Sequence, residues 1–382
     1  MGLSLTEIKM AKIYRGDKIS IEKRKIEEPE YLIKFKEKIE EEIKKESQTN
    51  ISNFTKKDTQ YWINYNRAKC NEKRFFYLLL DELLNIIQEP PHNIGRKPIS
   101  TKDMIFSSCL KVYNGFSSRK ISSDLKHAEE MNYITKAPHF NTLMAFMNNQ
   151  ITEELLKKLI TISAMPLKEL ETDFSMDATG FGSYQYERWM RVRFQKSLNG
   201  KSNTRGWRNY VKLHICCGTK TNVITSAQVT YGNIHDTTEL PYLVTQTSNN
   251  FNPIRYSADK GYASKKNMQL IASLDSIPYI PFKINSKPEK KPSIWNYMYE
   301  YFKTNRERYN SFYHKRSNSE TVFSMIKMRL GEFLKCKNHQ AQKNEVLLKC
   351  LVHNICILVQ YIFESNIKVD FNLCEQTYLA HK

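Results

Sequence analysis

Residues 174–181 read FSMDATGF, and two segments of similar texture follow, VKLHICCG at 211–218 and VITSAQVTYG at 223–232. Each is short, contains β-branched or aromatic residues and ends at or next to a Gly, which is typical of β-strands. From residue 235 onward, helical and strand-like segments alternate, and the last strand-like run is IPYIPF at 277–282. Three early strands followed by alternating helices and strands predict an α/β fold, with a mixed sheet flanked by helices.

A helical region precedes this part of the chain. Residues 1–88 are rich in charge and helical in pattern, and QEPPHNIGRKP (88–98) concentrates the Pro, Gly and basic residues of a linker. Three short helical patterns follow at 101–113, 118–130 and 139–149. We therefore expect four regions, which are a helical region (1–88), a helix-turn-helix-like region (89–165), a catalytic domain (166–335) and a C-terminal helix packed on it (336–382).

The three short helices have the pattern of a DNA reader. Asn114-Gly115 supplies a turn after the first, and Ser117 or Ser118 is expected to cap the second. A basic middle helix in such a unit suits a helix-turn-helix, although three-helix units without DNA share the pattern. The candidate DNA contacts here are Arg119, Lys120 and Lys126.

The overall charge favours a polyanionic partner. The 382 residues include 59 Lys plus Arg against 40 Asp plus Glu, a formal charge of +19. Such an excess binds nucleic acid well because each phosphate contact releases counterions, although a merely basic cytosolic protein has the same composition. Eight cysteines without metal-site spacing predict free thiols in a reducing cytosol. The apolar run 346–363 contains Lys349 and His353, so we expect a buried helix and no membrane span.

Three acidic residues stand out by their context. Asp177 and Asp259 each end a strand-like segment, at one edge of the predicted sheet, and Glu320 belongs to a helical stripe. That stripe holds Tyr313, Arg316, Glu320 and Lys327, which fall within about 60° if the helix is continuous.

Three neighbouring carboxylates repel one another, and hard divalent ions relieve that repulsion. Two such ions, roughly 3.5–4 Å apart, activate a water or 3′-hydroxyl and stabilise the leaving oxygen of an in-line displacement. Arg316 and Lys327 are suited to hold substrate phosphates, and Tyr313 to donate to a phosphate or pack on a sugar. The pattern therefore indicates phosphodiester chemistry on nucleic acid.

Each acid also has a structural interpretation. Asp173 alternates with Asp177 on the same strand face, so it competes for the catalytic role. Asp236 is interpreted as a helix N-cap because Glu239 completes a capping box. Glu320 lies four residues after Arg316, so the two could form an ordinary surface ion pair.

A second dense feature, residues 186–213, has eight basic residues and one acid, interleaved with aromatics. This mixture suits tracking a nucleic-acid backbone, and a solvated charged hairpin is the alternative. Trp295 is either a base-stacking residue or, by preference, a packing residue. The candidate DNA contacts in this segment are Arg188, Arg191, Arg193, Arg205 and Arg208.

DATGF around Asp177, ADKGY around Asp259 and the spacing of Tyr313, Arg316, Glu320 and Lys327 together resemble the Asp-Asp-Glu transposases of prokaryotic insertion sequences. More specifically, the chain resembles the group that spans insertion-sequence families four and five, which carries a Y-(2)-R-(3)-E-(6)-K signature. The stretch 95–125 also resembles the N-terminal DNA-binding region of such proteins, so the likeness covers roughly residues 95 to 360.

The resemblance implies a ribonuclease-H-like core, two Mg²⁺ or Mn²⁺ ions, and cleavage and strand transfer at terminal inverted repeats. It also implies target DNA as a partner, a homodimer in the paired-end complex, and a cytoplasmic, nucleoid-associated location. Carried over by position, Asp177, Asp259 and Glu320 become metal-binding catalytic acids, and Tyr313, Arg316 and Lys327 become phosphate contacts.

The chain departs from some of these proteins in one respect. Asp259 and Glu320 are only 320 − 259 = 61 residues apart, too few for the large β-rich insertion that some members carry there. The expected activity is that of a transposase. The alternatives are an inactive, DNA-binding regulator and a metal-dependent endonuclease without strand transfer.

Overall fold

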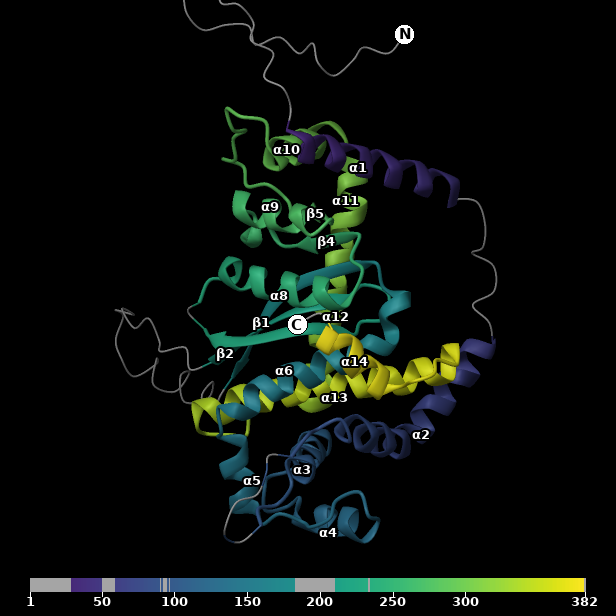
Figure 1. Cartoon of the computed structure of the whole chain (residues 1–382), viewed down its shortest axis with the longest axis vertical. Helices are drawn as coiled ribbons and strands as arrows, with labels where there is room; N and C mark the ends of the chain where they lie inside the picture. Colours follow the sequence, from purple (N-terminus) through teal and green to yellow (C-terminus); the bar gives the residue numbers. More distant parts are fainter. Residues whose placement is uncertain are drawn as a thin grey trace, which may run out of the picture.

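A five-stranded mixed sheet forms the centre of the computed structural model, with β1 (Asp173–Gly182) as its middle strand (Figure 1). The strand order is β3-β2-β1-β4-β5. Strands β1, β2 and β3 are antiparallel neighbours, whereas β4 and β5 continue the sheet in parallel on the other side of β1. The other strands are β2 (Tyr210–Gly218), β3 (Ile224–Tyr231), β4 (Arg255–Ala258) and β5 (Ile277–Tyr279). All five lie where the sequence predicted strands, and the mixed α/β class is confirmed.

Helices cover both faces of this sheet, and alternate side chains of β1 contact the helices on opposite faces. The structure describes residues 29–49, 59–89, 91, 95, 97–182, 210–232 and 234–380. Phe174 packs against Tyr256 and Phe251, on the face covered by α8 (Asp236–Asn250). Ser175, Asp177 and Thr179 point to the opposite face, where each bonds to the segment that leads into or forms α12 (Ser317–Leu330). Side chains alternate along a strand, so one ten-residue strand supplies both a core face and a polar face.

The start of α8 differs from the expectation. Asp236 is the first residue of the helix and makes no capping bond, so the predicted capping box with Glu239 is wrong. Its carboxylate instead forms an ion pair with Lys212 of β2, at 2.5 Å between Nζ and Oδ1. A charged partner across the sheet outcompetes a local bond to the neutral backbone. The next helix, α9 (Lys265–Ser273), does have a side-chain cap, from Ser264.

The helical stripe expected around Glu320 is interrupted. Tyr313 ends α11 (Arg306–Tyr313), a 3₁₀ turn covers His314–Arg316, and α12 begins at Ser317. The prediction of one continuous α-helix is therefore wrong. Lys315 and Arg316 both reach acids on the same face of β1, where they pair with Asp173 and Asp177.

Long helices pack below the sheet in the view of Figure 1, where α13 (His339–Ser365) lies beside α6 (Ile151–Ala164) and α2 (Thr59–Leu84). Among the described residues, α13 is the one helix long and apolar enough to cross a membrane, yet most of it is buried in the protein. It is a core helix, as the sequence predicted. Other helices in the described part of the chain are α1 (Glu30–Thr49), α10 (Ile294–Thr304), α14 (Phe371–Ala380) and the short 3₁₀ helices Met165–Leu170 and Lys260–Tyr262.

Three helices that follow α2 in the chain occupy the lower end of Figure 1. They are α3 (Thr101–Tyr113), α4 (Ser122–Glu130) and α5 (Phe140–Met147), close to the predicted ranges. However, α4 has no side-chain cap and begins four residues after Ser118, because Ser117 accepts a bond within the preceding turn. The expected cap at Ser117 or Ser118 is therefore wrong. The reading of these helices as a helix-turn-helix, and the domain boundaries, stay predictions.

Candidate active site

Asp177 and Asp259 stand side by side because of the register between β1 and β4. The parallel pairing joins Ser175 to Ser257 and Met176 to Ala258, so the next residues along the two chains are the two aspartates. The backbone of Asp259 is still extended, with φ −68° and ψ 157°. Neighbouring strands lie about 4.8 Å apart and equivalent residues share a face, so both carboxylates occur at one level on the α12 side.

Arg316 connects Glu320 to this pair. Its guanidinium lies 2.6 Å from Oδ2 of Asp177 through one nitrogen and 2.6 Å from Oε1 of Glu320 through the other. The Asp177 side chain is 19% exposed, whereas that of Glu320 is 59% exposed. The third acid therefore lies at the solvent side of the cluster, where it can change its partner.

The electrostatics of Asp177 reflect this crowding. Burial raises the pKa of its carboxyl group above the ordinary value, and the charges of Asp259 and Glu320 raise it further. A hydrogen bond from the Ala178 amide, at 2.8 Å, and the Arg316 charge act in the opposite direction without cancelling the increase. One guanidinium thus leaves the three acids incompletely neutralised.

The donor chemistry of the cluster fits a hard divalent cation. No group of three or more His, Cys, Asp or Glu within the described ranges is arranged to hold a metal directly. At this cluster, Arg316 supplies the positive charge between two of the acids. Carboxylate oxygens are nevertheless the ligands that Mg²⁺ and Mn²⁺ prefer, and the raised pKa of Asp177 marks a position where added positive charge is favourable. Asp177, Asp259 and Glu320 could hold such an ion once Arg316 moves from them to another anion.

The remaining members of the spacing pattern border the same strand face. Nζ of Lys327 donates to the Thr179 hydroxyl at 2.8 Å and lies 5.5 Å from the ring centre of Phe181. No carboxylate in the described part of the chain pairs with it, so its charge is free for a phosphate. The Arg316 guanidinium lies 6.0 Å from the ring centre of Tyr313. The structure thus places both cations along β1 on the side of the acids.

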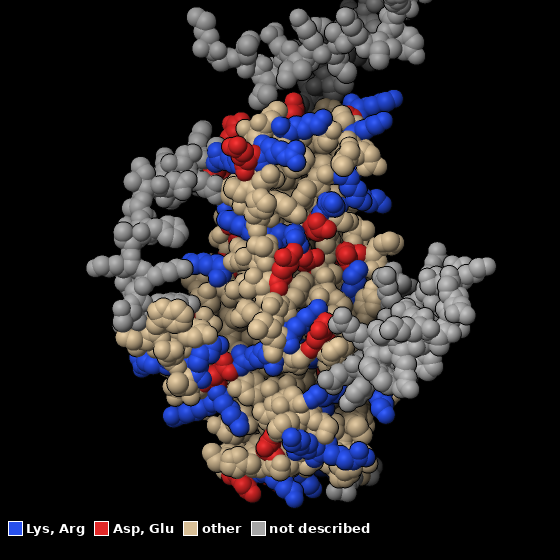
Figure 2. Space-filling model, turned by 180° about the vertical axis from the view of Figure 1, so that it is seen from behind, with Lys and Arg blue, Asp and Glu red and all other residues tan. Residues whose placement is uncertain are grey.

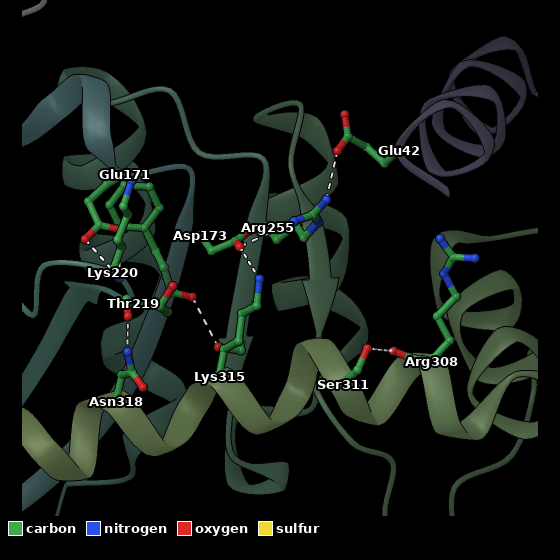
Figure 3. A network of polar contacts seen from close by, with 12 residues as sticks. Glu42, Glu171, Asp173, Thr219, Lys220, Arg255, Arg308, Ser311, Lys315 and Asn318 are labelled. Carbon is green, nitrogen blue, oxygen red and sulfur yellow. Dashed lines mark hydrogen bonds and ion pairs between the residues drawn. The ribbon is translucent and has the colours of Figure 1, made fainter. Parts of the chain in front are cut away.

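Asp173, the competitor for the role of Asp177, belongs to a different network (Figure 3). It pairs with Arg255 at 3.1 Å and with Lys315 at 2.6 Å. Arg255 also reaches Glu42 of α1 at 2.9 Å, so the network joins an N-terminal helix to the sheet. Two cations neutralise these two acids, which is the arrangement of a structural ion-pair cluster.

Sequence reasoning did not single out Tyr262 and His214. Tyr262 is buried, and burial raises the pKa of its hydroxyl group, with further increases from Asp236, Asp177 and Asp259, so the phenol lies near both acid groups. His214 lies on the α8 face of the sheet, 3.4 Å from Asp236, and burial lowers the pKa of its imidazole to about 4. The ADKGY motif contained the signal for Tyr262, whereas a lone His within a strand gave none.

The predicted DNA contacts have mixed outcomes. Arg119 and Lys120 lie in the turn before α4, with their cations over the rings of Phe140 (5.0 Å) and Phe116 (4.4 Å). Lys126 is exposed on α4. Trp295 is a packing residue, because its buried indole donates to the Lys287 carbonyl at 2.9 Å. The candidates that lie outside the described residues are Arg188, Arg191, Arg193, Arg205 and Arg208.

Comparison with protein families gives one match. Residues 169–355 match the family described as Transposase DDE domain, a range that contains the whole sheet and all three acids. Comparisons with curated proteins and with solved structures give no significant match. The matched range supports a DDE transposase, a family of DNA-cleaving enzymes.

Proposed function

We propose that this protein is a transposase that binds the terminal inverted repeats of an insertion sequence, cuts them and transfers the strands to target DNA. The observation that carries the proposal is the register that sets Asp177 beside Asp259, with Arg316 joining Asp177 to Glu320. The strand order β3-β2-β1-β4-β5, with only β2 antiparallel to its two neighbours, supports a ribonuclease-H-like core. The signature spacing supports membership of insertion-sequence families four and five.

The three acids are proposed to hold two Mg²⁺ or Mn²⁺ ions. Bound divalent ions would supply positive charge to the phosphate oxygens and a deprotonated water or 3′-hydroxyl as nucleophile. Glu320 is exposed and closes the set from α12, whereas the strand register holds the two aspartates in place. Because Asp177 is partly buried among like charges, a bound cation would relieve the repulsion between the acids.

The cations of this face are proposed to hold the DNA backbone. Lys327 donates to the neutral Thr179 hydroxyl of β1, so its charge is not paired with an acid there. Arg316 has a planar guanidinium that can donate to two phosphate oxygens at once. When Arg316 moves from the carboxylates to a phosphate, it brings the scissile group close to the acids. The ring of Tyr313 lies 6.0 Å from the Arg316 guanidinium, at the edge of a cation–π contact. We expect the active form to be a dimer that pairs two ends in the cytoplasm.

The decisive experiment is cleavage of labelled inverted-repeat ends taken from the flanks of the reading frame. Wild-type protein with Mg²⁺ is expected to nick the ends and to join the new 3′-hydroxyl to target plasmid. Asp259→Ala should nick at background level, whereas Glu300→Ala, an exposed acid on α10, should behave as wild type. Equal nicking by wild type and Asp259→Ala would refute the catalytic assignment. Nicking without joining would leave an endonuclease, and metal-independent binding without nicking would leave a regulator.

A further inference from the structure

A basic cavity of about 580 Å³ lies between the α3–α4 turn, α5 and the segment before α13. Four of its lining residues carry positive charge and none carries negative charge. Phe140 and Met144 of α5 supply an apolar side. Its basic residues are Lys111, Arg119, Lys335 and Lys337. The cavity is distinct from the acid cluster and is built from two distant parts of the chain, residues 111–144 and 335–341.

Lys111 gives the strongest indication of a ligand. It is only 3% exposed, in the last turn of α3, and no hydrogen bond or ion pair from any described residue reaches its ammonium group. A buried charge without a partner is unfavourable, so an anion in the cavity would be stabilised. Lys335 approaches from the other side, with Nζ 3.9 Å from the position that a Cβ at Gly115 would take.

The two lysines affect one another. Partial loss of solvent around its ammonium group lowers the pKa of the otherwise exposed Lys335, the positive charge of Lys111 lowers it further, and Glu345 only partly opposes the change. Glu345 already accepts the backbone N–H groups of Lys335 and Cys336, at 2.8–3.0 Å. Its carboxylate oxygens are therefore occupied by these backbone bonds. The cavity, which has no acidic lining residue, keeps a surplus of positive charge.

We propose that this cavity binds one phosphate of the DNA backbone, as a second anchor for the duplex that the acid cluster processes. The inference rests on the proposed function. Arg119 and Lys120 extend the positive charge from the cavity over the adjacent surface, which suits a polymer with repeated phosphates better than a single small anion. In Figure 2, Lys and Arg also predominate over Asp and Glu in the lower half of the face shown, the end where α3, α4 and α5 lie.

The segment that borders the cavity is attached to the strand that carries Asp177. Leu334 donates its backbone N–H to the Gly182 carbonyl at 2.9 Å, which fixes the cavity segment to the end of β1. Gly182 lies five residues beyond Asp177, a span of about 17 Å along a strand. One turn of B-DNA is about 34–36 Å, longer than this part of β1, so we expect one DNA end to reach from the acid cluster to the cavity.

The test is the salt dependence of binding to a 30-base-pair duplex of mixed sequence, in EDTA. Backbone contacts do not depend on sequence, and each phosphate contact contributes about 0.9 to the slope of log K against log[salt]. We expect Lys335→Gln/Lys337→Gln to lower the slope by about 1 and the affinity about tenfold at 100 mM salt. The control, Lys266→Gln/Lys303→Gln on α9 and α10, changes charge equally at the other end of the molecule and should leave the slope unchanged.

Lys111→Met separates binding from folding. It keeps the apolar stem and removes the unpaired charge, so we expect an equal or higher Tm together with weaker DNA binding. If Lys111→Met does not fold, the exposed Lys335 and Lys337 variants decide the question alone. An unchanged slope in the double variant would overturn the proposal, as would tight binding of inorganic phosphate that leaves duplex affinity unchanged at constant ionic strength.

The two proposals fail separately. Mg²⁺-dependent nicking by a protein whose slope is insensitive to Lys335 and Lys337 would remove the anchor and leave the transposase. A slope that falls in the double variant, in a protein that never nicks, would leave a DNA-phosphate site without the proposed chemistry.

Discussion

Two acid clusters lie on the same face of β1, four residues apart, and they differ in charge balance. Around Asp173, two acids meet two cations, Arg255 and Lys315. Around Asp177, three acids share one guanidinium, that of Arg316. The first cluster is closed and ties α1 to the sheet, whereas the second has surplus negative charge. Identical residue types thus form a structural cluster in one place and a candidate cation site in the other.

The largest expected difference between the clusters is in activity. Asp177→Asn removes a ligand from the surplus cluster while keeping its size, so DNA nicking should fall by more than about 100-fold, because even the outer partners of metal ligands contribute 10–100-fold. Asp173→Asn, the matched change four residues away, should keep its activity per folded molecule. The measurement is initial nicking rate with Mg²⁺, corrected for the folded fraction by circular dichroism. Equal losses in both variants would contradict the comparison.

The second difference is in the response to metal. A ligand that binds only the folded state stabilises it by about 2.7 kcal/mol when present at 100 times its Kd. Mn²⁺ or Mg²⁺ should therefore raise the Tm of wild type and of Asp173→Asn, in a thermal melt without DNA. Asp177→Asn should show little or no increase. A shift that is the same in all three proteins would place the metal elsewhere.

The third difference is in stability. Asp173→Asn removes an acidic partner from Arg255, which is 8% exposed and also pairs with Glu42. Removing one partner of a buried pair usually destabilises by 3–5 kcal/mol, and the remaining partner and the half-buried Lys315 reduce this to about 2 kcal/mol. Asp177→Asn should change stability less, because it also relieves repulsion. Urea unfolding at pH 7 measures both, and a smaller loss at Asp173 than at Asp177 would reverse the assignment.

The sequence predicted the parts of this comparison that depend on local pattern. The period of two placed Asp173 and Asp177 on one face of a strand, and Asp259 directly follows the last residue of β4, as predicted. The predicted strand end at Asp177 is wrong, because β1 continues to Gly182 through its antiparallel pairing with β2. The register between β1 and β4 could not be predicted, because it pairs residues 82 positions apart in the sequence, such as Asp173 and Arg255. The charge balance around each acid depends on that register and on α1, which no local pattern specifies.

The wrong expectations have the same cause. From local sequence patterns, Asp236 was expected to cap a helix, and residues 313–327 were expected to form one helix. Tertiary ion pairs override both, through Lys212 at Asp236 and through the acids of β1 at Lys315 and Arg316. A charged partner brought close by the fold is stronger than a cap or an ideal helical turn. Such overrides occur where charged residues converge, which is why they gather around the candidate site.

The smallest expected effect is the pH dependence of the difference between Asp177→Asn and wild type. The folded-state pKa of Asp177 is raised, mainly by burial and then by Asp259 and Glu320, so the folded protein holds this proton more tightly than the unfolded chain. Below the unfolded pKa of about 3.9 the wild-type group is neutral in both states. As pH rises through the folded pKa, the carboxylate form destabilises the wild type, and the variant gains relative stability. Urea midpoints of both proteins between pH 4.5 and 8 should therefore diverge in favour of the variant as pH rises, by less than the loss at Asp173. A difference that moves in the other direction would mean that Arg316 more than compensates for the neighbouring acids, and the cluster would no longer have surplus negative charge.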